Sequence, residues 1–195
     1  MSFRSQYLAD IGLVANPYPN NPAHRIQSIY RTVRLGQINN AFAMQLWNAH
    51  LQPVHSGLTT LPTNQAAFDN FIVQTALAVE GTLNAAGKGG FGVAQKIINL
   101  FMKDVWAFHL TPLAADPFLH VPIDCGVLGK LRTIPVTWKT WTGAVAGIST
   151  APTVNDYLAI QASFRSFLAA PTGSGASRPI FASVIEMDQF LWHKI

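Results

Sequence analysis

Apolar residues recur every three or four positions along most of this chain, and this spacing limits its possible folds more than any other feature. The period is that of one buried face of an α-helix. Clusters of proline and glycine, as in residues 16–22 and 85–92, separate the periodic segments. The spacing predicts helices over about 23–51, 64–83, 93–109, 154–168 and 180–194. We therefore predict a mostly α protein.

The remaining segments are less regular. Residues 50–63 are expected to form a loop, and a short helix is expected directly after Asp124. Residues 132–152 are rich in threonine, glycine and tryptophan, so turns or short strands are expected there.

Length and composition indicate one folded domain with two lobes. A chain of 195 residues can bury a substantial core, and a content of 49% hydrophobic and 11% charged residues excludes a disordered chain. No apolar run is long enough to span a bilayer, and the first residues lack a signal-peptide pattern. The single cysteine, Cys125, cannot form an intrachain disulfide. We expect a cytoplasmic protein.

Basic residues exceed acidic ones by 13 to 9, which gives a net charge of +4. They gather in three groups: Arg25, Arg31 and Arg34; Lys88, Lys96 and Lys103; and Lys130, Arg132 and Lys139. One interpretation is an ordinary solvated surface. The other is a patch that follows the phosphates of a polyanion such as DNA.

Lys96 is the first candidate for chemistry. It stands near the start of the predicted helix 93–109, whose opposite, apolar side would pack in the core. The preceding residues, Gly92-Val93-Ala94-Gln95, form the end of a glycine-rich turn, where backbone N–H groups can approach and bind a phosphate. A simple surface lysine in a first helical turn is the alternative.

Asp124 is the second candidate. It ends the sequence His120-Val121-Pro122-Ile123-Asp124 and precedes a predicted helix. Aspartate at this position is often an N-cap, and an acid held there is also rigidly positioned. A lysine amine and a nearby carboxylate are the groups needed to attack a sugar C1′ and expel a base.

These two segments resemble the helix-hairpin-helix DNA glycosylases. The turn before Lys96 is similar to the hairpin motif G-V-G-x-K, with Ala94 in place of the second glycine, and the segment before Asp124 is similar to V-P-x-D. The helix sequence KIINLFMKDVW is closest to the archaeal 8-oxoguanine glycosylases, in which a second lysine follows after seven residues, as Lys103 does here. The resemblance covers about half of the chain, residues 90–131 and 180–192.

The C-terminal sequence DQFLW is similar to the D-x-L-L-W helix of the same archaeal group. Asp188 and Trp192 are four residues apart and so share one helix face. The resemblance implies that this face lines a base pocket. A terminal helix that packs its tryptophan into the core is the alternative.

The resemblance implies a glycosylase, with AP lyase chemistry if Lys96 attacks C1′ while Asp124 assists. If Asp124 activates a water instead, the enzyme would release the base only. The implied residues are Lys96 and Asp124 for catalysis; Asp188, Trp192 and Lys103 for the base pocket; and Lys88, Gly90, Gly92 and Gln95 for the DNA backbone. The hairpin and catalytic helix would occupy about 84–131.

We expect this protein to be a monomer that binds double-stranded DNA in the nucleoid. We expect it to bind no membrane and to need no metal ion or other cofactor. Its target would be an oxidised guanine in repair, or a modified viral cytosine in antiviral defence. The main alternative is a helical DNA-binding protein that kept the hairpin and lost the chemistry. A helical interaction domain with merely solubilising basic residues is the third interpretation.

Overall fold

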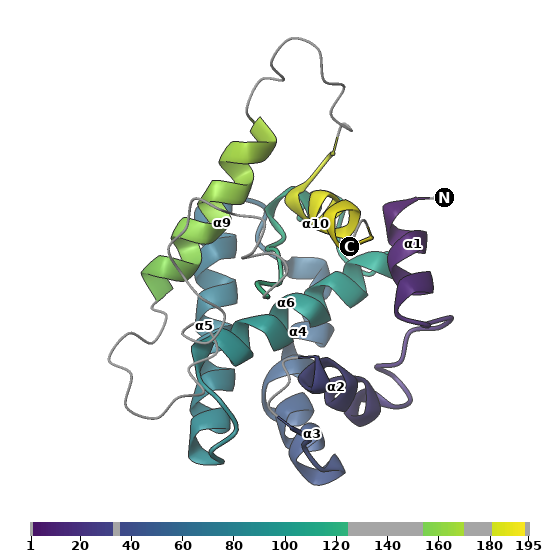
Figure 1. Ribbon diagram of the computed structural model, residues 1–195, viewed down its shortest axis with the longest axis vertical. Helices are drawn as coiled ribbons and strands as arrows, with labels where there is room; N and C mark the ends of the chain where they lie inside the picture. The colour runs from purple at the N-terminus through teal and green to yellow at the C-terminus, as the bar shows by residue number, and fades with distance from the viewer. Residues whose placement is uncertain (1, 33–35, 125–153, 170–180, 194–195) are drawn as a thin grey trace.

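A computed structural model describes residues 2–32, 36–124, 154–169 and 181–193 (Figure 1). This part of the chain is mostly helical and contains no strand, so the predicted mostly α class is confirmed. The α-helices are α1 (Phe3–Asp10), α2 (Pro22–Arg31), α3 (Asn40–Leu46), α4 (Gln52–Ser56), α5 (Gln65–Ala85), α6 (Phe91–Ala107), α9 (Val154–Ala169) and α10 (Val184–His193). A π-helical turn (Trp47–Leu51) and two 3₁₀ turns (Leu58–Thr60 and Asp116–Phe118) complete the elements.

Four helices begin where a side chain caps the first turn. The side-chain oxygens of Ser2, Asn21, Asn39 and Asn64 each accept a hydrogen bond from a backbone N–H three residues later. These bonds satisfy N–H groups that have no partner inside the helix. They explain the starting positions of α1, α2, α3 and α5.

The long helix predicted over 23–51 is wrong, because the chain forms two helices there. The first, α2, ends at Arg31, and Asn39 then caps the start of α3. Gly36 between them has a φ of 102°, which lies outside the helical region. The loop predicted over 50–63 is also wrong, since α4 and a 3₁₀ turn occupy much of it. The apolar period continues across the break between α2 and α3 and hides it.

Four other helices overlap their predicted ranges, whereas α1 was not predicted. The predictions 64–83, 93–109 and 154–168 correspond to α5, α6 and α9, and the predicted range 180–194 contains the shorter α10. The short helix expected after Asp124 and the turns or strands expected over 132–152 lie outside the described residues. None of the described helices is both long and apolar enough to cross a lipid bilayer.

Helix α6 runs through the centre of the molecule (Figure 1). It contacts α5, α1 and α2, and every one of its residues except Leu100 is buried. The expectation that only one side of this helix packs in the core is therefore wrong. Lys96, Asn99 and Lys103 are buried on it as well. Buried polar and charged groups need partners, and these partners define the candidate site.

Candidate active site

A pocket of about 60 Å³ lies beside α6. This volume is below the range typical of small-molecule sites, so a ligand of that size would require the walls to move apart. Its walls come from α1, α2, α6, the extended segment before residue 125, and α10. The lining residues are Tyr7, Ile11, Arg25, Ile29, Thr32, Lys96, Leu100, Lys103, Pro122, Asp124 and Asp188. Four predicted site residues thus lie around one cavity.

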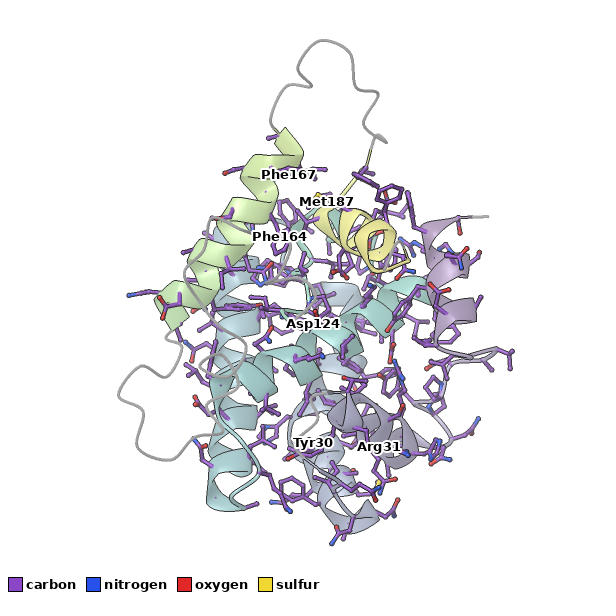
Figure 2. The ribbon with its side chains drawn as sticks, in the orientation of Figure 1. Tyr30, Arg31, Asp124, Phe164, Phe167 and Met187 are labelled. Carbon is purple, nitrogen blue, oxygen red and sulfur yellow. The ribbon has the colours of Figure 1, made fainter. Side chains whose placement is uncertain are left out.

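Lys96 and Asp124 form an ion pair at this pocket. Lys96 Nζ lies 3.7 Å from Asp124 Oδ2 and 3.3 Å from the backbone oxygen of Thr32, to which it donates. The Lys96 side chain is 5% exposed and that of Asp124 is 14% exposed. Figure 2 labels Asp124 near the middle of the molecule, over α6. The ammonium is thus held by a carboxylate and by the carbonyl end of α2, where the helix dipole favours a cation.

A second ion pair lies on the same side of α6. Lys103 Nζ donates to Asp188 Oδ2 at 2.6 Å, and both side chains are only 3% exposed. The Lys103 ammonium also lies 4.7 Å from the centre of the Tyr7 ring. Burial raises the pKa of Asp188, and the nearby Lys103 opposes this rise. Asp124 raises the same pKa further and Lys96 lowers it, so the four charges act on one another.

Trp192 belongs to α10, like Asp188, but its side chain lies outside the described residues. Its predicted role in the base pocket therefore stays a prediction.

The residues predicted to contact the DNA backbone differ in accessibility. Lys88 is exposed in the turn between α5 and α6, and partly exposed Gly90 is the N-cap residue of α6. Gly92 is buried, and Gln95 is fully buried with its side chain in hydrogen bonds. The prediction that Gly92 and Gln95 contact DNA is wrong, because both lie in the packed core of α6.

The predicted basic patch is also corrected in part. Arg25, Lys96 and Lys103 are buried and paired with carboxylates instead of facing solvent. Arg31 and Lys88 are exposed. Arg34, Lys130, Arg132 and Lys139 lie outside the described residues.

A buried network behind the pocket was missed by the sequence analysis. Asp104, fully buried, accepts hydrogen bonds from Tyr7 and Tyr18 at 2.6 Å each and from Arg25 at 2.7 and 2.8 Å. Burial and the Asp104 carboxylate raise the pKa values of both tyrosines, which therefore remain donors. Tyr7 and Arg25 also line the pocket, so this network fixes one of its walls.

A second polar network is joined to α6 through Asn99. His120 bonds through Nε2 to Asp69 at 2.7 Å and through Nδ1 to the Tyr157 hydroxyl at 2.6 Å. Burial lowers the pKa of His120, although Asp69 opposes the change. A neutral His120 fits both contacts, with Nε2–H donating to Asp69 and Nδ1 accepting from Tyr157. The Tyr157 hydroxyl in turn accepts from Asn99 Nδ2 at 2.9 Å.

Comparisons with protein families, curated proteins and solved structures find no match to this chain. Within the described ranges, no three His, Cys, Asp or Glu side chains are grouped as metal ligands would be. The chemistry of the pocket must therefore be interpreted from its own charged side chains and its apolar walls.

Proposed function

We propose that this protein is a DNA glycosylase that accepts one extruded nucleotide in the pocket beside α6. The observation that carries the proposal is the placement of Lys96 Nζ 3.7 Å from Asp124 Oδ2 on the wall of one pocket. An amine and a carboxylate at this separation can act on the same sugar carbon. Asp124 is the most exposed of the four charged side chains, which suits a group that meets the sugar of an entering nucleotide.

In the proposed reaction, Lys96 Nζ loses a proton to Asp124 and forms a bond to C1′. The bond between C1′ and the base breaks, and the departing base takes its electron pair and the proton that Asp124 accepted, which restores the Asp124 carboxylate. The sugar ring then opens as a proton passes from the Lys96 nitrogen to O4′, and a Schiff base between Lys96 and C1′ remains. The Asp124 carboxylate also stabilises the positive charge that grows on the sugar as the base leaves.

The other end of the pocket would hold the base. Lys103 offers N–H donors and Asp188 offers carboxylate acceptors, while Ile29, Leu100 and Pro122 supply apolar contact area. An extruded base needs both kinds of contact, since its edge is polar and its faces are apolar. An oxidised guanine is the first substrate to test, and a modified cytosine is the second. Trp192 remains the candidate for stacking on the base.

A DNA-binding protein without base release is the second candidate. Lys96 is 5% exposed and already donates to the Thr32 carbonyl, so its ion pair with Asp124 could serve only to hold α2, α6 and residues 120–124 together. Such a protein would bind DNA with an affinity that falls steeply as salt increases, and it would leave every base in place.

Single-turnover base release from a panel of duplexes with oxidised guanine or modified cytosine tests the proposal. The unchanged protein should release at least one of these bases. Lys96→Gln and Asp124→Asn should each abolish or strongly slow release, whereas Asp156→Asn, which alters an exposed carboxylate in the first turn of α9, should retain the rate constant. Release that survives in Lys96→Gln but not in Asp124→Asn would replace the lysine nucleophile with a water activated by Asp124. DNA binding without release from any duplex would favour the second candidate.

A further inference from the structure

We infer that Gln95 is a positioning residue that sets the separation of Lys96 and Asp124. This inference rests on the proposed function. Gln95 immediately precedes Lys96, and its side chain is bonded to Ile123, which immediately precedes Asp124. One buried amide therefore connects the backbone beside the proposed nucleophile to the backbone beside the proposed acid.

The connection consists of two hydrogen bonds, one donated and one accepted by the Gln95 side chain. Gln95 Nε2 donates to the carbonyl oxygen of Ile123 at 3.0 Å, and the N–H of Ile123 donates to Gln95 Oε1 at 3.3 Å. Gln95 Nε2 also donates to the Gly92 carbonyl at 2.8 Å, and Asn99 Nδ2 donates to Gln95 Oε1 at 3.1 Å. With four partners and no exposed surface, the Gln95 amide has little freedom to move.

The Gln95 side chain takes the place of a neighbouring β-strand for this segment. Residues 119–124 are neither helix nor strand, and Val121 and Ile123 are fully buried. Buried backbone groups need hydrogen bonds, and here a glutamine side chain supplies both bonds for Ile123 in the way a neighbouring strand would. The position of the Asp124 backbone relative to α6 therefore depends on Gln95.

Gln161 on α9 makes the equivalent pair of bonds two residues earlier. Its Nε2 donates to the Val121 carbonyl at 2.8 Å, and the Val121 N–H donates to its Oε1 at 3.0 Å. Both glutamines are fully buried. They differ in that Gln161 is adjacent to neither Lys96 nor Asp124. Gln161 is therefore a matched control, similar in burial and bonding but not next in sequence to either member of the ion pair.

The experiment compares Gln95→Met with Gln161→Met, since methionine fills a similar volume without the amide. Both variants should be destabilised, because each removes two side-chain hydrogen bonds to the buried backbone of one residue. Only Gln95→Met should lose catalysis specifically, with a single-turnover rate lower by about 100-fold, since a shift of about 1 Å in a reacting group has this effect. Its affinity for DNA should be unchanged, and Gln161→Met should retain most of the rate. Gln95→Glu is a second variant in case Gln95→Met does not fold; it keeps the acceptor for the Ile123 N–H, loses the donor, and should be slowed in the same way.

Crystal structures of the two methionine variants separate a failure of this inference from a failure of the proposed function. The distance from Lys96 Nζ to Asp124 Oδ2 should exceed about 4 Å, the usual limit of an ion pair, in Gln95→Met and should stay at its present value in Gln161→Met. An unchanged distance in Gln95→Met, or an equal change in both variants, would overturn the positioning role. If the unchanged protein released no base at all, the proposed function would fail by itself, and these structures would still decide the role of Gln95.

Discussion

Replacement of Asp104 by asparagine should be among the most destabilising single changes in this protein. The two carboxylate oxygens of Asp104 receive four hydrogen bonds: Oδ1 from Tyr7 and Arg25 Nη2, and Oδ2 from Tyr18 and Arg25 Nε. Asparagine keeps the shape but turns one oxygen into an NH₂ group, which faces two donors. It also removes the charge that compensates the Arg25 guanidinium, whose side chain is only 8% exposed.

The size of the effect follows from this geometry. Removing one partner of a buried ion pair costs about 3–5 kcal/mol, since the other charge stays buried without compensation. A chain of 195 residues loses roughly 2–4 °C in Tm for each kcal/mol, so the expected decrease in Tm is on the order of 6–20 °C. Tyr18→Phe removes only one bond to the carboxylate and should cost about 1.5–3 kcal/mol.

Urea unfolding followed by tryptophan fluorescence measures these losses, because Trp47 and Trp106 are 7% and 1% exposed in the folded protein. Asp156→Asn is the control: this carboxylate is exposed in the first turn of α9, and its loss should cost at most about 1 kcal/mol. If Asp104→Asn cost no more than Asp156→Asn, the buried network would not contribute to stability as described.

Two further predictions concern the other charged and polar clusters. Lys103→Met and Asp188→Leu should each lower the free energy of unfolding by about 3–5 kcal/mol, since each leaves one charge buried alone. The double variant should lose less than either single variant, because no charge is then left buried alone. A double-mutant cycle in which the two losses simply add would refute this prediction. The unfolding free energy should also fall as the pH drops below 6.5, the ordinary value for histidine, since the pKa of His120 is lowered in the folded state and the unfolded chain binds the proton more readily. A pH titration of stability should show a smaller decrease in His120→Gln than in a variant of exposed His24, and equal decreases would contradict the assignment.

The sequence predicted α5, α6, α9 and α10 because their apolar spacing is a local property. It also predicted Lys96, Lys103, Asp124 and Asp188 as site residues, and these side chains lie around one pocket. The prediction failed where the same local spacing is compatible with two different environments of a helix face. Lys96 and Lys103 follow the same spacing whether their side of the helix faces water or a buried pocket, and only the packing of α1, α2 and α10 around α6 decides between these possibilities.

The role of Gln95 could not be predicted for a related reason. Its hydrogen-bond partner Ile123 is 28 residues away, and Gln161, which holds the same segment, is 66 residues from Gln95 along the chain. Asp104 likewise depends on Tyr7, Tyr18 and Arg25, all more than 75 residues earlier. Contacts at such separations leave no local signal in the sequence of a single chain.

Borohydride trapping followed by peptide mapping tests the central claim most directly. The unchanged protein is incubated with a duplex from which it releases a base, the Schiff base is reduced, and mass spectrometry locates the modified residue. The account predicts one nucleotide adduct, on Lys96, that is absent from Lys96→Gln. Base release accompanied by an adduct on another lysine, or by none, would contradict the assignment of Lys96 as the nucleophile.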